Sequence, residues 1–287
     1  MLRLAVTTAA ETFERMCDPL AARDIAVEHL QVTERVVPLT DPPETSVDVG
    51  FVYPSRPMEG GVVDARHGIP WVNGRAAVLT SRNKAGVIAA LSAADVPVPE
   101  TRLVSNPASE ADVVDAAADL GYPLVVKPNS TTRGAGVAKA SDRDSLLGIV
   151  DYLDLVHDFR ATGDKSFLLQ EYLPDARDLR VMVLDGAVVG CVERRLPDDA
   201  DDAGRWKHNV HRGATATAVD PPARVRSLAV EAAATLDIDY LGVDVLLAGD
   251  RAVVSETNAR PTVDDAKYDD GFWDRLAALI RRTAAEK

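Results

Sequence analysis

The sequence predicts a mixed fold, in which a small α/β unit is combined with α+β units, and not one doubly wound sheet. Apolar residues make up 46% of the 287 residues, which is enough for a sizeable core. Strand and helix patterns mix along the whole chain. After residue 166, apolar runs joined by short turns indicate several antiparallel hairpins.

The first 80 residues are expected to form a small α/β domain. Its expected elements are strands at 2–8, 25–30 and 47–53, a helix at 11–24 and a loop at 54–61. A proline-rich break at 38–46 separates the last two strands.

A second unit is expected from Ser81 to about residue 166. A helix opens at Ser81 and stops before two prolines, because proline cannot continue a helix. The later elements are a strand at 101–104, a helix at 108–122 that ends at Gly121, a strand at 123–128, a glycine-containing loop at 130–140 and a helix at 141–159 capped by Ser141 or Asp142.

The remaining residues, 167–287, are expected to be rich in hairpins. The expected elements are a strand at 167–173, a hairpin at 179–195, a helix at 223–236, a hairpin at 242–258 and a helix at 270–282. Asp185-Gly186 is typical of a type I′ turn in the first hairpin.

Composition excludes several classes of function. A net charge of −13 argues against binding a nucleic acid backbone. No apolar stretch has the length of a membrane span, and the first residues lack the plan of a signal peptide. Cys17 and Cys191 show no metal-ligand spacing and no disulfide framework, which indicates a reducing cytoplasm. Only seven lysines accompany 25 arginines, so each lysine is conspicuous.

The hairpin near the C-terminus carries two carboxylates and an amide. Glu256 and Asn258 share a face because side chains alternate along a strand. A three-residue turn at 249–251 would place Asp244 opposite Glu256, whereas a two-residue turn would place them on opposite faces. These oxygen donors suit Mg²⁺ or Mn²⁺, and the alternative is an acidic surface hairpin.

A second group of residues suits a triphosphate. Lys127 ends an apolar strand that reads as buried, so its ammonium needs an anionic partner. The loop that follows has small and polar residues whose N–H groups can approach an anion: Ser130, Arg133, Gly134 and Gly136. The sequence is not a Walker loop. Lys84, at the start of a helix, is a second phosphate candidate, and its alternative is a solvated helix residue.

Two further groups are weaker when taken alone. A strand exit at Gln170, Glu171 and Tyr172 could border a flat heterocycle, and Asp178 could take ribose hydroxyls, although in isolation an ordinary loop with a surface Asp is favoured. Four basic residues and one asparagine in an acidic region indicate an anion site or a surface ion-pair cluster: Arg194, Arg195, Lys207, Arg212 and Asn209. His208 and His211 lack a third partner at zinc-ligand spacing.

The order of these motifs resembles that of ATP-grasp ligases, and among them the RimK-like α-L-glutamate ligases. The stretches NVHRGA, YLGVDVLL and ETNARP carry the resemblance together, within a similarity that runs from Ser81 to Arg282. The resemblance implies an ATP-grasp fold with an N-terminal domain (1–80), a central lid subdomain (81–166) and a C-terminal subdomain (167–287), with the nucleotide between the last two. Relatives also imply a homo-oligomer.

The resemblance also implies roles for single residues. Lys84, Lys127 and the loop 130–137 would hold the phosphates of ATP. The nucleotide would also contact Gln170, Glu171, Tyr172, Asp178, Lys207, His208 and Asn209. Asp244, Glu256 and Asn258 match the ligands of Mg²⁺ or Mn²⁺. Arg195 and Arg212, with Lys127, would act on the acylphosphate or the carboxylate substrate.

One departure from the family bears on the substrate. After Glu-x-Asn, members that modify ribosomal proteins continue with a Ser-Pro-Gly-rich turn, whereas this chain reads ARPTVDDAKYDD. Arg260 and Lys267 add positive charge there, which favours a small polyanionic acceptor, such as a glutamylated cofactor, over a protein tail.

The implied reaction transfers the γ-phosphoryl group of ATP to a carboxylate, and the amino group of an amino acid, implied to be glutamate, then attacks the acylphosphate. Arg195 or Arg212 would stabilise the oxyanion. Two alternatives stay open, namely a kinase on the same scaffold and a nucleotide-binding module without activity.

Overall fold

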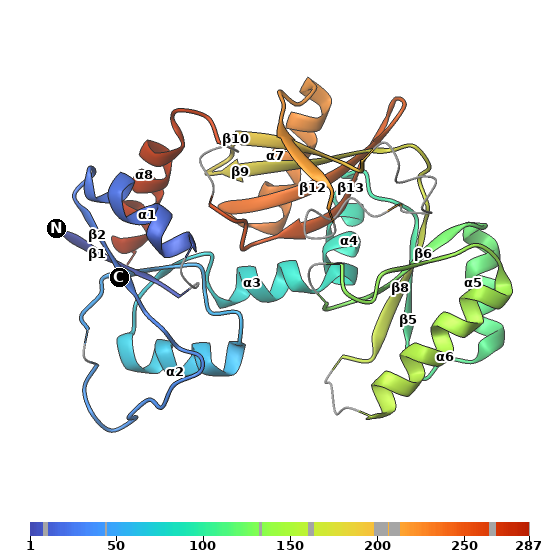
Figure 1. Ribbon diagram of the computed structural model, residues 1–287, viewed down its shortest axis with the longest axis horizontal. Helices are drawn as coiled ribbons and strands as arrows, with labels where there is room; N and C mark the ends of the chain where they lie inside the picture. The colour runs from blue at the N-terminus through green and yellow to red at the C-terminus, as the bar shows by residue number, and fades with distance from the viewer. Residues whose placement is uncertain are drawn as a thin grey trace.

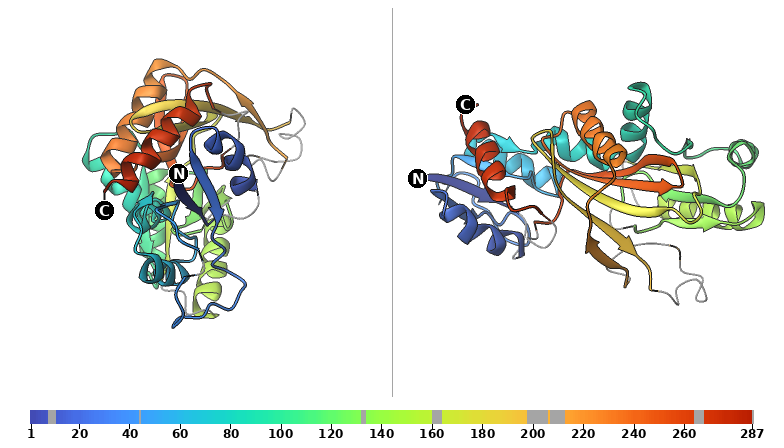
Figure 2. Two further views of the ribbon diagram at one scale, coloured as in Figure 1. Left: turned by 90° about the vertical axis from the view of Figure 1, so that its left-hand side faces the viewer. Right: turned by 90° about the horizontal axis from the view of Figure 1, so that it is seen from above.

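The computed structural model describes residues 1–7, 11–43, 45–131, 134–159, 164–197, 206, 213–263 and 268–286. The described strands form three sheets that follow one another along the molecule (Figures 1 and 2). None of the described helices combines the length and the apolar composition that a membrane crossing requires. The expected cytoplasmic location and the homo-oligomer stay predictions.

The N-terminal sheet is parallel, with strand order β2-β1-β3-β4. Its strands are β1 (Leu2–Val6), β2 (Ile25–His29), β3 (Val49–Phe51) and β4 (Trp71–Val72). Its helices are α1 (Glu11–Ala21), α2 (Pro57–His67) and α3 (Arg75–Arg82). The α/β character predicted for the first 80 residues is confirmed.

The expected loop at 54–61 is wrong, because α2 begins inside it at Pro57. Proline suits the first helical turn, where its missing N–H is not needed. Two glycines, Gly60 and Gly61, hid the helix from the sequence pattern. A Cβ on Gly60 would lie 2.4 Å from the ring of Tyr53, so this glycine serves close packing.

Gly50 is expected to be essential for packing of the N-terminal sheet. A Cβ at Gly50 would lie 2.2 Å from Cε3 of Trp71, whose indole is held by a 2.8 Å hydrogen bond to Asp64. Gly50→Ala is therefore expected to destabilise the protein by about 3 kcal/mol through overpacking. Gly61→Ala is the matched control, because no atom lies within 4 Å of its added Cβ. Denaturant unfolding of both variants tests this, and equal stability would contradict it.

The central sheet is antiparallel, with strand order β5-β8-β6-β7. Its strands are β5 (Thr101–Ser105), β6 (Leu124–Pro128), β7 (Ala138–Ala140) and β8 (Ser166–Glu171). Helices α5 (Glu110–Leu120) and α6 (Arg143–Phe159) cover its outer face (Figure 1). β8 begins where the predicted C-terminal subdomain begins, yet it pairs with β5 and β6.

The C-terminal sheet is antiparallel, with strand order β11-β10-β9-β12-β13. Its strands are β9 (Arg177–Leu184), β10 (Ala187–Arg195), β11 (Thr215–Ala218), β12 (Tyr240–Ala248) and β13 (Arg251–Asn258). Helices α4 (Lys84–Ala93) and α7 (Ala223–Leu236) share a hydrophobic core with one face of it. The helix expected from Ser81 begins at Lys84, because Asn83 separates it from α3 and accepts a hydrogen bond from Gly86 N.

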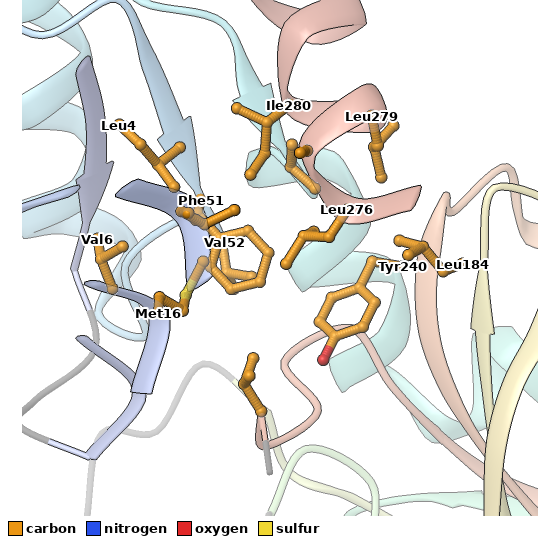
Figure 3. Close-up of a cluster of buried hydrophobic side chains, with 14 of the residues drawn as sticks. Leu4, Val6, Met16, Phe51, Val52, Leu184, Tyr240, Leu276, Leu279 and Ile280 are labelled. Carbon is orange, nitrogen blue, oxygen red and sulfur yellow. The ribbon is translucent and has the colours of Figure 1, made fainter. Parts of the chain in front are cut away.

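A second core joins the N-terminal sheet to the C-terminal sheet. Helix α8 (Phe272–Ala284) returns to the first domain, where Leu276 and Ile280 lie beside Leu4 and Phe51 (Figure 3). Tyr240, at the start of β12, belongs to the same cluster and is fully buried. The end of the chain thus fixes the first domain against the sheet that carries the candidate site.

Candidate active site

Charged side chains gather on one face of the C-terminal sheet. Asp178 of β9 pairs in register with Arg194 of β10, and Arg180 of β9 pairs with Asp244 of β12. Asp244 pairs in turn with Glu256 of β13. Residues that are directly opposite in an antiparallel sheet share a face, so four neighbouring strands present these five side chains together.

A β-bulge at Ser255 brings Asp244 and Glu256 together. The hairpin closes with a two-residue turn, because Ala248 pairs with Arg251, so of the two alternatives the structure has the one that by itself would put Asp244 and Glu256 on opposite faces. The register then shifts by one residue between Asp244 and Val245, which restores the predicted pairing of the two carboxylates. The two carboxylates therefore pair because of the bulge, which neither of the two alternative turns included.

The bulge also serves Lys127. Its extra residue turns a carbonyl out of the ladder, and Lys127 Nζ donates to Ser255 O at 3.2 Å. The same ammonium donates to Gln170 Oε1 at 2.9 Å. The Ser255 hydroxyl donates to Asp244 O at 3.1 Å, which ties the bulge to β12.

Lys84 reaches the same place from the start of α4. Its Nζ lies 3.6 Å from Glu256 Oε1, and its side chain is 6% exposed. Asn129, just after β6, holds this helix start, because its Oδ1 accepts from Ala85 N at 2.8 Å and its Nδ2 donates to Asn83 Oδ1. Lys84 and Lys127 therefore converge on the two carboxylates predicted to bind a metal ion, Asp244 and Glu256.

Burial lowers the pKa of Lys127 to about 8. The negative charges of Glu256 and Asp244 oppose this shift, and the neighbouring charge of Lys84 adds to it. An ammonium in such surroundings is stabilised by a further anion, so the position favours a phosphate.

Asp244 is held by two arginines. Arg180 binds it in a bidentate pair, with Nε–Oδ1 at 2.6 Å and Nη2–Oδ2 at 2.8 Å. Arg194 Nη2 lies 3.1 Å from Oδ2 and also donates to Asp178 at 2.5 Å. Burial alone raises the pKa of Asp244, but the two guanidiniums outweigh it and hold the pKa at about 2.

The cluster is positive in an acidic protein. Four cations face three carboxylates, whereas the whole chain has a net charge of −13. The members are Lys84, Lys127, Arg180, Arg194, Asp178, Asp244 and Glu256. An excess of cations around two buried carboxylates and the partly exposed Glu256 suits a polyanion that arrives with a divalent ion.

Arg195 does not join this cluster. A regular register from the Asp185-Gly186 turn would put Arg195 on this face, but a bulge at Val189 shifts β10 and puts Arg194 there instead. Arg195 is on the opposite face, where its exposed side chain donates to Glu193 at 2.8 Å. The geometry therefore favours Arg194 for the contact that the resemblance assigned to Arg195.

The strand exit after β8 is placed beside the cluster. Gln170 accepts from Lys127, while the Glu171 carboxylate accepts two hydrogen bonds from Arg251 and one from Glu100 N. Burial raises the pKa of Glu171, but the hydrogen bonds and the charge of Arg251 outweigh burial, so the pKa is lowered overall. The pair of Glu171 and Arg251 links the central sheet to the β12–β13 hairpin.

Tyr172 is the aromatic member of this exit. Lys139 Nζ of β7 lies 4.8 Å from its ring centre, and Trp206 meets it edge-on at 6.0 Å. A cavity of about 350 Å³ is lined by Glu171, Tyr172, Pro174 and residues 120–123. Aromatic rings beside an ammonium suit a flat base, as the sequence predicted for Tyr172.

The glycine loop is described in part. Ser130 is half-buried, and Gly134 and Gly136 have φ of 65° and 74°, which favour glycine. A Cβ on Gly136 would also lie 2.8 Å from Pro128 Cγ. The predicted site residues Arg133, Lys207, His208, Asn209 and Arg212 lie outside the described residues.

The predicted metal ligands fit a hard divalent ion. Asp244 and Glu256 offer carboxylate oxygens on one face, and the guanidiniums on Asp244 show that this position accepts positive charge. Asn258 Oδ1 accepts from Arg260 N at 2.8 Å. In the described part of the chain, no three histidine, cysteine or carboxylate side chains group as metal ligands, so the site needs the Asn258 oxygen or ligands from the nucleotide.

Sequence reasoning missed Arg180 as a site residue and passed over Lys139 and Arg251. A signal existed for Arg180, because it lies in the strand expected from residue 179, and it shares a face with Asp178 once that strand is extended to begin at Arg177. Lys139 and Arg251 depend on contacts between the two sheets, which local patterns do not contain.

Known proteins match most of the chain in sequence. A family model described as a RimK-like ATP-grasp domain matches residues 81–272. A probable alpha-L-glutamate ligase of Citrobacter koseri is 31% identical over 217 residues, which cover 74% of this chain and 68% of that protein. A ribosomal protein bS6–L-glutamate ligase of Shigella boydii is 31% identical over 73% of this chain and 66% of its own length. The chain thus matches about two thirds of these curated relatives.

Solved structures show the same fold. The RimK domain protein ATP-grasp from Sphaerobacter thermophilus has a TM-score of 0.67 and 22% identity, with 99% of this chain and 98% of that chain covered. A D-alanine–D-alanine ligase from Bacillus anthracis has a TM-score of 0.69 and 18% identity, with 99% and 97% covered. The predicted ATP-grasp fold is confirmed.

Proposed function

The chain belongs to the RimK-like ATP-grasp family of ligases, and from this premise we propose that it joins a carboxylate to the amino group of glutamate at the expense of ATP. One observation carries the proposal. Lys84, Lys127, Asp244 and Glu256 come from four separate elements and converge on one face of a sheet. Such convergence suits a nucleotide polyphosphate and its metal ion better than it suits a structural ion-pair cluster.

ATP and Mg²⁺ are the proposed ligands of this cluster. Solved relatives of the same fold include a D-alanine–D-alanine ligase complexed with ATP and an ATP-grasp ligase, PsnB, complexed with Mg and ADP. Asp244, Glu256 and Asn258 would hold the ion, and Lys84 and Lys127 would bind phosphate oxygens. When bound, Mg²⁺ offsets charge on the transferred phosphoryl group.

The residues then divide the reaction between them. A carboxylate is a poor electrophile, so its oxygen first attacks the γ-phosphorus of ATP, and ADP leaves. The amine attacks the acyl carbon, and the C–O bond to phosphate breaks as the amide forms. Lys127 would offset charge on the transferred group, and Arg194, whose side chain is 12% exposed, would stabilise developing oxyanions.

The acceptor is proposed to be a small polyanion. Arg260 donates to Tyr53 O, and burial together with the charge of Arg82 lowers its pKa to about 10. Arg82 itself donates to Ser55 O of the same loop. Two guanidiniums thus stand beside the end of β13, where a second carboxylate of the acceptor would relieve their repulsion. Named relatives act on a ribosomal protein, which makes a protein tail the competing acceptor class.

Mass spectrometry tests this proposal. The protein is incubated with ATP, Mg²⁺, glutamate and a panel of small anionic acceptors and acidic peptides. We expect ADP, free phosphate and one acceptor that gains a glutamyl residue. A product that keeps the phosphate would identify a kinase, and no acceptor-stimulated ADP at all would identify a module without ligase activity. Glu256→Gln is the negative control.

A further inference from the structure

Arg180 and Arg194 both bind Asp244, but they differ in how firmly they are held. Arg194 has a second carboxylate partner in Asp178, and its side chain is 12% exposed. Arg180 is 30% exposed, and Asp244 is its ion-pair partner within the described residues. Arg194 is therefore held by two carboxylates. Arg180 is partly exposed to solvent and has to break its contact with only one carboxylate of the described residues, that of Asp244, in order to move.

Arg180 occupies the oxygens that a metal ion would need. Its Nε and Nη2 groups take Oδ1 and Oδ2 of Asp244, so these N–H donors stand where a divalent ion would coordinate. A divalent ion at Asp244 competes with these hydrogen bonds for the lone pairs of the same two oxygens. A guanidinium displaced in this way would stand beside the divalent ion, without the carboxylate of Asp244 to offset its own charge. An anion from the substrate would then stabilise it.

The same face carries a hydrogen-bond donor that its carboxylates leave unused. The Nε–H of Arg194 is buried and makes no hydrogen bond within the described part of the chain. A released Arg180 and this N–H could both donate to one anion between β9 and β10. Carboxylate and phosphoryl oxygens match the forked donors of arginine.

We propose that Arg180 is a catalytic residue that exchanges partners: it holds Asp244 before the metal ion binds and moves to the phosphoryl or carboxylate oxygens of the substrate once the ion has taken Asp244. This inference rests on the proposed function. It assigns an order of events, in which metal-nucleotide binding prepares the arginine for the second anion. A fixed structural clamp on Asp244 is the competing account.

Metal binding without nucleotide tests the first half. Arg180→Met is expected to bind Mn²⁺ roughly tenfold more tightly than the unchanged protein, because the competing cation is gone. Free Mn²⁺ is measured by electron paramagnetic resonance. Arg177→Met is the matched control, because Arg177 lies on the opposite face of β9 and its partner Glu193 keeps Arg195 at 2.8 Å. Unchanged or weaker Mn²⁺ binding in Arg180→Met would overturn the proposal and support a structural clamp.

Phosphate binding tests the second half. Calorimetry measures the affinity of inorganic phosphate for the protein saturated with Mn²⁺ and ADP. Arg180→Met is expected to weaken phosphate binding roughly tenfold, and Arg180→Lys by less, because lysine keeps the charge and loses the fork. Equal phosphate affinity in Arg180→Met would overturn the substrate role. Neither arm uses an acceptor, so a failure of the ligase assignment shows separately, as an absence of acceptor-stimulated ADP.

Discussion

Lys127→Met is expected to lower kcat/KM for ATP by roughly 10³-fold, because the variant loses a buried ammonium at the proposed phosphate position. Lys127 is 5% exposed and donates to Gln170 and Ser255 O. Methionine has a similar length and no charge, so the thermal midpoint should change little. ADP release with an active acceptor measures the loss. Activity within tenfold of the unchanged protein would contradict a phosphate role for Lys127.

The same lysine predicts a pH dependence. Its pKa of about 8 lies below the ordinary value of 10.5, so the folded protein without nucleotide releases this proton earlier than the unfolded chain does. This group therefore adds stability as pH rises from about 8 towards 10.5. Affinity for ATP should fall over the same range, because the ammonium is lost. The KM for ATP should therefore rise above pH 8. Lys127→Arg should abolish this rise, since arginine stays charged.

Glu256→Gln is expected to lower metal-dependent activity roughly 10²-fold or more while leaving the fold intact. Glu256 is 36% exposed in its side chain, and its cationic neighbour Lys84 is 3.6 Å away, so little stability depends on this charge.

Asp244→Asn is expected to abolish activity and also to cost about 3 kcal/mol of stability, because Arg180 and Arg194 lose their shared carboxylate.

Denaturant unfolding and Mn²⁺ titration separate these two variants. We expect Glu256→Gln to lose metal affinity with an unchanged midpoint, and Asp244→Asn to lose both. If the two variants were equally stable, the bidentate pair of Arg180 and Asp244 would contribute little to the free energy of unfolding, which would contradict the predicted cost of Asp244→Asn. If Glu256→Gln kept full metal affinity, the divalent ion would not be held by this hairpin.

Local patterns predicted most elements of the fold. The turn at Asp185-Gly186 has φ of 50° and 70°, as a type I′ turn requires, and the Asp142 side chain accepts from Ser145 N at the start of α6. Helix α2 was missed because Gly60 and Gly61 look like a loop, and the contact that needs Gly60 is made with Tyr53 elsewhere in the chain.

The candidate site was predicted in its residue types but not in its register. Two bulges, at Val189 and Ser255, each shift one strand by one residue. The first puts Arg194 in place of Arg195 on the site face, and the second lets Asp244 face Glu256 across a two-residue turn. A bulge leaves no local signal in a run such as AVVGCVERR, because its position depends on which face must meet the neighbouring strands.

The central claim is that this face activates a carboxylate by phosphorylating it. The direct test uses an acceptor whose carboxylate is labelled with ¹⁸O, incubated with ATP, Mg²⁺ and glutamate. The account predicts that the released phosphate carries one labelled oxygen from the acceptor, because the bond that breaks lies between the acyl carbon and that oxygen. Unlabelled phosphate, released while a glutamylated product accumulates, would contradict the acylphosphate route.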